Sequence, residues 1–129
     1  YEDLPARYEN YDFSIFASSC ENLPNVVLEI MASGLPLLSS NMGPMPDVIK
    51  DGGIYFNPLS VEDIKEKVLE GINNPIKLHN KSIIAQQIAS NYSWDSTAKE
   101  TIAYLIAIVD RAKLNLEWLL RAIIKFCVI

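Results

Sequence analysis

The feature that most constrains the fold is an alternation of short apolar segments with helical segments, joined by short turns. Residues 12–17, 37–40 and 54–56 are short apolar runs bounded by turn residues, which is typical of buried strands. Residues 25–33 and 46–51 lie between them and have helical patterns. Because crossovers this short connect neighbouring parallel strands, the sequence predicts an α/β fold with a Rossmann-like parallel sheet.

The second half of the chain is helical. We expect helices over 61–73, with Ser60 as N-cap, over 76–90, and from Ser93 towards Asp110 or beyond. In the first half, Asn25 is expected to cap the helix 25–33.

Three strands are few for a doubly wound domain, in which about five or six are usual. A missing N-terminal portion is therefore our interpretation, and a small intact domain is the alternative.

Composition excludes several classes of function. The net charge is −5 and Lys and Arg are not clustered, which argues against nucleic-acid binding. Cys20 and Cys127 are the only cysteines, with no metal-ligand spacing, so neither a structural zinc nor any other bound metal is expected. There is no signal-peptide pattern, and no stretch reaches the roughly 18 uninterrupted apolar residues of a membrane span. We expect a cytoplasmic protein, with a peripheral place at the inner membrane face as the alternative.

Two carboxylates, Glu21 and Glu29, lie on either side of a strand-to-helix turn. Ligands in open α/β sheets bind at the carboxyl ends of strands, where Glu21 is expected. Glu29 should share a helix face with Asn25, and the helix start offers free N–H groups that suit phosphate. A nucleotide-sugar has this pattern, with a diphosphate between hydroxyl-bearing rings. The alternative is that both glutamates are solvated and that the domain binds no ligand, because Glu is common near helix starts.

Four ordered motifs resemble one family, the group 1 or family 4 retaining glycosyltransferases, which have the GT-B fold. Glu21 and Glu29 match its two glutamates with seven residues between them. The resemblance covers roughly residues 4–105. The matching stretches are Ser18-Ser19-Cys20-Glu21 with Pro24 to Pro36, Ser40 to Ile49, Asp51 to Pro58, and Tyr92-Ser93-Trp94.

The resemblance implies roles for individual residues. Glu21 would contact hydroxyls of the donor sugar, and Glu29 would hold the ribose hydroxyls. Backbone N–H groups around Leu23, Asn25 and Val26 would meet the donor sugar and the diphosphate. Pro24 stands where many members have Gly, so one N–H donor is lost there.

The resemblance also implies a reaction: transfer of a hexose from a UDP- or GDP-sugar to a polysaccharide or glycolipid acceptor, with retention of configuration. No cofactor is implied besides the nucleotide-sugar donor, and no metal is needed to bind it. The family's catalytic and diphosphate-clamping residues lie upstream of residue 1, so the catalytic residues of this chain stay unknown. The chain alone is expected to be inactive without an N-terminal domain or a partner chain. A non-catalytic or split nucleotide-sugar-binding module is the alternative function.

The C-terminal tail is the most apolar segment. We expect a donor-binding domain over 1–113 and an apolar helix over 114–129. Glu117, Arg121 and Lys125 form one polar stripe on this helix, and the rest is largely apolar. The apolar face is expected to pack on its own domain, on a missing partner surface, on another copy, or at a membrane surface.

Overall fold

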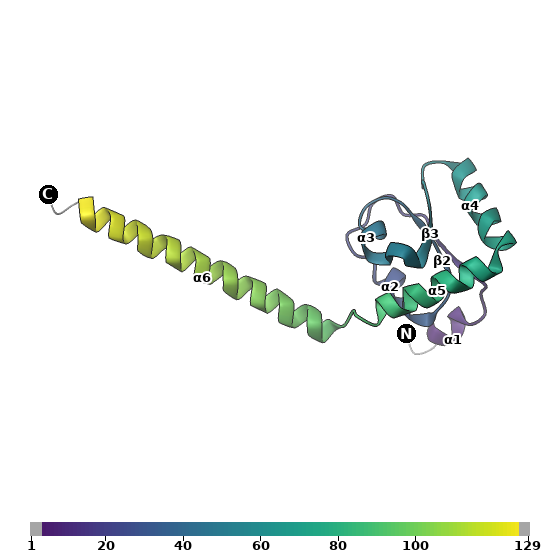
Figure 1. The fold of residues 1–129 in the computed structure, drawn as a ribbon, viewed down its shortest axis with the longest axis horizontal. Coiled ribbons are helices and arrows are strands. Elements are labelled where there is room, and N and C mark those ends of the chain that lie inside the picture. The colour runs from purple at the N-terminus through teal and green to yellow at the C-terminus, as the bar shows by residue number, and fades with distance from the viewer. Residues whose placement is uncertain (1–3, 127–129) are drawn as a thin grey trace. The chain divides into compact units, whose positions relative to one another are not determined.

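The structure is a computed structural model that describes residues 4–126, with side chains described for Leu4 and residues 6–116. By its internal contacts the chain divides into two units, residues 1–91 and 92–129. The elements of the first unit alternate as predicted, and helices follow (Figure 1). They are α1 (Leu4–Tyr8), β1 (Ser14–Phe16), α2 (Asn25–Ser33), β2 (Leu37–Ser40), α3 (Met45–Ile49), the 3₁₀ helix η1 (Lys50–Gly52), β3 (Gly53–Phe56), α4 (Val61–Asn73), α5 (Pro75–Ala89) and α6 (Trp94–Phe126).

The three strands form one parallel sheet in the order β1-β2-β3. In the register, Leu37 of β2 lies opposite both Ser14 of β1 and Gly53 of β3. Helix α2 connects β1 to β2, and α3 with η1 connects β2 to β3. The prediction of a Rossmann-like parallel sheet from the alternating pattern is confirmed.

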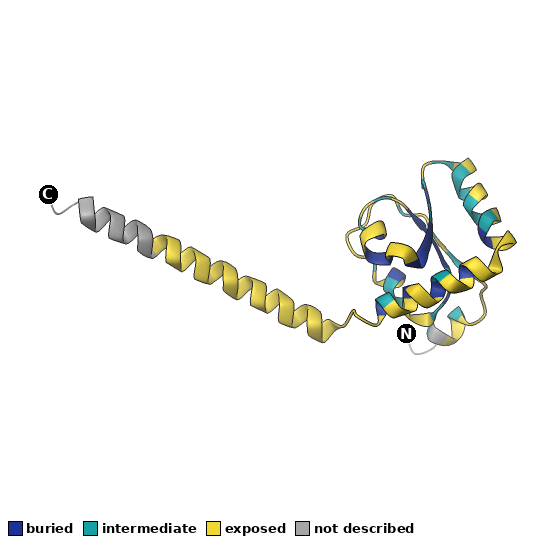
Figure 2. Cartoon of the chain, in the orientation of Figure 1, coloured by how far each residue is buried: buried dark blue, intermediate teal, exposed yellow. Residues whose placement is uncertain are grey.

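The core of the first unit lies on both faces of the sheet, because Leu37 and Leu38 are consecutive in β2 and point to opposite sides. Leu37 belongs to a cluster with residues of α2 and α3, and Leu38 packs with Ile54 and Phe56 of β3. Helix α5 contributes to both clusters, through Ala85 and Ala89 on one side and Leu78 on the other. The buried residues accordingly concentrate in the strands and on the inner faces of the helices (Figure 2). The first cluster comprises Val27, Ile30, Met31, Leu35, Leu37, Met45, Val48, Ile49, Ala85 and Ala89.

Helix ends follow local side-chain chemistry, with one correction to the prediction. Ser60 caps α4 as expected, because its Oγ accepts a hydrogen bond from the backbone N of Asp63 at 3.2 Å. The expected cap of α2 is wrong: the N-cap is Pro24, in an extended conformation, and no side chain caps the helix. Asn25 is instead the first helical residue, so its own side chain lies beyond the position from which it could cap. Gly34 ends α2 with a φ of 79°, a left-handed conformation that glycine adopts without strain.

Helix α6 is a single helix of 33 residues that crosses the position between residues 113 and 114 where a boundary was expected. By internal contacts the chain divides after residue 91, and the domain bounds 1–113 and 114–129 stay a prediction. The helix starts where Ser93 Oγ accepts from the backbone N of Ser96 at 3.1 Å, and neither Gly nor Pro follows within it to end it. The polar stripe of Glu117, Arg121 and Lys125 lies outside the described side chains, and the packing of segment 114–129 stays a prediction.

The phenol of Tyr55 in β3 gives the first unit a pH-dependent stability. Its hydroxyl donates to the carbonyl of Lys50 at 2.6 Å, and burial, followed by the charges of Asp51 and Asp47, raises its pKa to about 12 from 10.0. The raised pKa means that the folded state favours the protonated phenol. The stabilisation by this phenol is therefore fully present below pH 10 and is lost as the pH rises from 10 to 12. The group is partly exposed, so solvent screening reduces the expected loss to about 1 kcal/mol.

Urea unfolding at pH 9 and pH 11.5 measures this loss. The Tyr55→Phe variant should lose about 1 kcal/mol less between the two pH values than the wild type. Tyr104→Phe, which removes an exposed phenol from α6, serves as the control. If the free energy of unfolding depends on pH in the same way in the wild type and in Tyr55→Phe, Tyr55 is not the cause of the loss.

Candidate functional site

The loops that follow β1 and β2 meet at one edge of the sheet. Both strands end at this edge because they are parallel, and residues 17–24 and 41–44 continue from them. A Cβ added at Gly43 would lie 3.5 Å from the backbone oxygen of Glu21, so the two loops are in contact. Gly43 itself has a φ of 61°, which a side chain would strain. This is the edge at which open α/β sheets bind ligands.

Helix α2 begins at this edge without a side-chain cap. The backbone N of Val27 donates to Pro24 O at 3.1 Å, closing the first turn. Within residues 4–116, the N–H groups of Asn25 and Val26 have no hydrogen-bond acceptor, and both residues are exposed. The helix start therefore presents two free donors and the positive end of the helix dipole, a combination that attracts anions.

The two carboxylates lie on either side of this helix start in sequence. Glu21 is exposed in the loop after β1, and Glu29 is half-buried on α2. Glu29 is four residues after Asn25 and so shares its helix face, away from the buried residues Val27 and Met31. Across the described side chains, neither glutamate forms an ion pair. Both therefore keep their oxygens available as hydrogen-bond acceptors.

Leu23 completes the set of predicted site residues. Its side chain is exposed in the loop just before Pro24. The loop thus carries Glu21 and Leu23 to the same edge at which α2 starts. Whether all five predicted residues contact one ligand stays a prediction.

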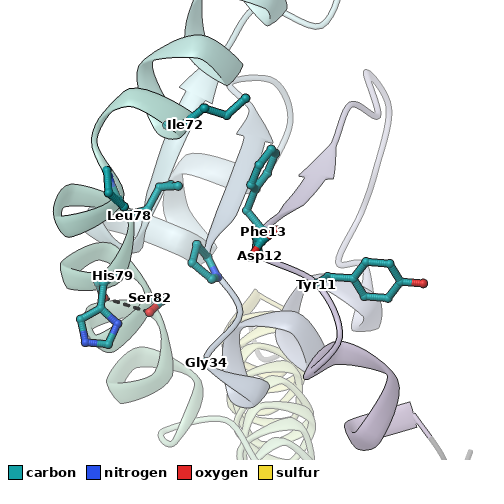
Figure 3. A pocket seen from close by; sticks show the side chains of 11 residues that line it. Tyr11, Asp12, Phe13, Gly34, Ile72, Leu78, His79 and Ser82 are labelled. Carbon is teal, nitrogen blue, oxygen red and sulfur yellow. Dashed lines mark hydrogen bonds between the residues drawn. The ribbon is translucent and has the colours of Figure 1, made fainter.

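A hollow in the described part of the chain lies at the opposite edge of the sheet. It has a volume of about 540 Å³ and is shown in Figure 3. Neither Glu21 nor Glu29 lines it. Its lining comes from segments that precede strands or join helices: Tyr11, Asp12, Phe13, Gly34, Pro36, Gly71, Ile72, Pro75, Leu78, His79 and Ser82.

The sequence does not predict this hollow because its lining is spread over four separate segments, and no local pattern brings these together. One of its polar side chains already has a hydrogen-bond partner, because Ser82 Oγ donates to the carbonyl of His79 at 2.9 Å. The hollow lies at the amino ends of the strands, where this class of sheet does not bind its main ligand, so it does not replace the edge at Glu21 as the candidate site.

Within the described part of the chain, no group of three or more His, Cys, Asp and Glu side chains is placed to hold a metal ion. Over the same residues, no helix combines the length and the apolar character needed to cross a membrane.

Comparison with solved structures defines the class of the fold. A sucrose-phosphate synthase from Thermosynechococcus elongatus superposes with a TM-score of 0.72 at 18% identity, covering 86% of this chain and 28% of that protein. The crystal structure of TarM superposes with a TM-score of 0.65 at 18% identity, covering 76% of this chain and 20% of that one. The fold is that of the GT-B glycosyltransferases.

Residues 1–88 match the family model described as glycosyl transferases group 1, and the chain belongs to this family. An uncharacterized glycosyltransferase of Methanocaldococcus jannaschii is 32% identical over 114 residues, covering 82% of this chain and 28% of the relative. The O-antigen chain mannosyltransferase B of Escherichia coli is 27% identical over 101 residues, covering 78% of this chain and 26% of the relative. The chain thus spans about a quarter of the length of these relatives.

Proposed function

We propose that this chain is the donor-binding part of a retaining glycosyltransferase that transfers a hexose from a UDP- or GDP-sugar to a polysaccharide or glycolipid acceptor. The observation that carries the proposal is the pair of unpaired carboxylates, Glu21 and Glu29, on either side of the uncapped start of α2. Membership of the glycosyl transferases group 1 family supports it.

Each part of the donor has a chemically matched group at this edge. The diphosphate would accept hydrogen bonds from the free N–H groups of Asn25 and Val26, where the helix dipole also favours negative charge. An ionised carboxylate only accepts hydrogen bonds, so it suits the hydroxyls of sugar rings and repels phosphate. We assign the ribose hydroxyls to Glu29 and the donor-sugar hydroxyls to Glu21.

The loop between the two carboxylates would contribute through its backbone. The N–H group of Leu23 would meet the donor sugar or the diphosphate. Pro24 has no N–H group and so contributes no donor. Its place at the N-cap of α2 nevertheless leaves the following two N–H groups uncapped.

The names of relatives support the choice of substrate class. One relative is named an O-antigen chain mannosyltransferase, and another, from Mycobacterium tuberculosis, is named a glycogen synthase, 26% identical over 108 residues. Both names denote the building of a sugar polymer. Retention of configuration and a hexose donor are part of the proposal because the group 1 glycosyltransferases that the motifs resemble share them.

Titration of the 129-residue chain with UDP and with UDP-glucose, and in parallel with GDP and GDP-mannose, tests the assignment. Glu29→Ala should weaken the binding of both the free nucleotide and the nucleotide-sugar by tenfold or more, because a hydrogen bond to a charged group contributes about 1.5–3 kcal/mol. Glu21→Ala should weaken only the nucleotide-sugar, by a similar factor. Calorimetry or chemical shifts in an amide NMR spectrum give the dissociation constants.

Glu66→Ala is the matched control, because Glu66 is an exposed glutamate on α4 and is not one of the predicted site residues. It should leave all dissociation constants unchanged. Equal binding by the wild type and Glu29→Ala would reject the ribose assignment, and a loss of free-nucleotide binding in Glu21→Ala would reject the sugar assignment.

A non-catalytic or split module with the same donor site is the alternative, since the chain spans only about a quarter of its relatives. Catalysis requires donor and acceptor to be held together in reacting geometry. Hexose transfer measured with the protein that supplies the acceptor half separates the two functions. Binding without transfer favours the module.

A further inference from the structure

Helix α6 carries an apolar stripe with the spacing of a coiled coil. Ala98, Ile102, Leu105, Val109, Ala112 and Leu116 alternate at steps of four and three residues. The larger four have exposed fractions of 59%, 54%, 51% and 62% in chain order. The sequence continues the same spacing at positions 119, 123 and 126, all apolar. Apolar residues at alternating steps of three and four over about four heptads indicate a coiled-coil seam.

The stripe is wide enough to form an interface. Ile106 and Ile108 flank the seam on either side, and both are exposed. Burying a side chain of this size removes on the order of 100 Å² of apolar surface. The four larger seam residues and the two flanking isoleucines make six such side chains in each copy. Their burial in a pair of copies would remove on the order of 1,000 Å² of apolar surface, which reaches the size of a specific interface.

The length and period of the stripe favour a helix as its partner. A helix of 33 residues is roughly 50 Å long, whereas a small domain is roughly 30 Å across. A repeat of 3.5 residues keeps its seam facing a second helix that supercoils with it, but it drifts around a straight helix. A partner helix of equal length and equal period can follow the whole stripe, and α6 of a second copy has both properties.

The charges of α6 argue against a lipid surface as the occupant. Its described charged residues are balanced, with three acidic and three basic side chains: Asp95, Glu100, Asp110, Lys99, Arg111 and Lys113. Asp95 also pairs with Lys99 at 2.6 Å. Helices that lie in anionic membrane surfaces are instead rich in Lys and Arg on the polar face.

We propose that two copies of this chain associate through α6, with the stripe Ala98–Leu116 of each helix packed against that of the other. This pairing does not depend on the proposed donor site.

Analytical ultracentrifugation of the 129-residue chain between 1 and 100 µM tests the pairing. The wild type should sediment as a dimer, at twice the chain mass of 14.5 kDa. The double variant Leu105→Glu/Val109→Glu should raise the dissociation constant at least 100-fold, because it places two charges in the seam. Ala103→Glu/Ala107→Glu puts the same charges on the opposite face of the same turns, and should leave the dimer intact.

A second variant separates lost pairing from a lost helix. Leu105→Ala/Val109→Ala keeps or raises helix propensity, so a tenfold or greater weakening of the dimer would reflect the seam itself. The amide NMR spectrum of residues 4–91 should stay unchanged in every variant. A wild type that is monomeric at 100 µM overturns the proposal. So does a dimer that the seam variants leave intact, or a monomer that cosediments with vesicles of anionic phospholipid.

Discussion

Replacing Phe56 with alanine is expected to lower the free energy of unfolding of the first unit by about 3–5 kcal/mol. The Phe56 side chain is 1% exposed at the end of β3, where it packs with Leu38, Ile54 and Leu78. Truncation removes the apolar contacts and leaves a cavity between the sheet and the helices that cover this face. Urea unfolding followed by far-ultraviolet circular dichroism measures the change.

The expected loss is a large share of the roughly 5–15 kcal/mol by which domains are stable, so the variant should be close to unfolding at 37 °C. Leu59→Ala is the control, since Leu59 lies three residues further on and is 74% exposed. Its free energy of unfolding should change by no more than about 0.5 kcal/mol. A Phe56→Ala variant that loses less than 1 kcal/mol would show that this face of the sheet is not a closed core.

The order of elements could be predicted because local signals decide it. Strand β2 and helices α2 and α4 have the predicted bounds, since Gly34 with Pro36 ends one helix and Ser60 begins another. The cap of α2 was misassigned because both Pro24 and Asn25 are compatible with a helix start. Only the backbone conformation of Pro24, with φ at −76° and ψ at 116°, distinguishes them.

The apolar pattern of helix α5 does not predict which of its faces are buried. Its apolar residues do not form one stripe, because Ala85 and Ala89 pack in one cluster and Leu78 in the other. A helix that crosses the end of a sheet has two buried directions, and a search for one amphipathic face does not reveal them. The hollow beside Leu78 and His79 is not predicted for a different reason: its lining comes from four separate segments of the chain.

The candidate site could be predicted only in part. Its place at the carboxyl ends of the strands follows from the parallel sheet, and the sequence supplied Glu21 and Glu29. The contact between the loop at Gly43 and the backbone of Glu21 joins segments that are far apart in the sequence. Such a contact depends on tertiary packing, so spacing along the chain does not reveal it.

The second large loss of stability is expected at Gly52 of η1. This residue has no room for a side chain, because η1 lies against α5. A Cβ at Gly52 would lie 2.7 Å from the Cα of Ala85 and 2.9 Å from its backbone N. These are backbone atoms of α5, so the whole helix would have to move. We expect Gly52→Ala to lower the free energy of unfolding of the first unit by about 3 kcal/mol, at the upper end for overpacking. Urea unfolding measures it.

Gly71→Ala makes the same change at a second buried glycine, with the opposite expected effect on stability, and serves as the control. Gly71 is also buried, but a Cβ there would lie 3.4 Å from the Leu78 Cδ1 atom, an ordinary van der Waals contact. Because Gly71 is inside α4, alanine should raise the free energy of unfolding by about 0.5–1 kcal/mol through its higher helix propensity. The two substitutions add the same methyl group. Changes of opposite sign in the free energy of unfolding would therefore show that the loss at Gly52 comes from the close approach of η1 to α5. If Gly52→Ala is as stable as the wild type, the two segments do not approach this closely in solution.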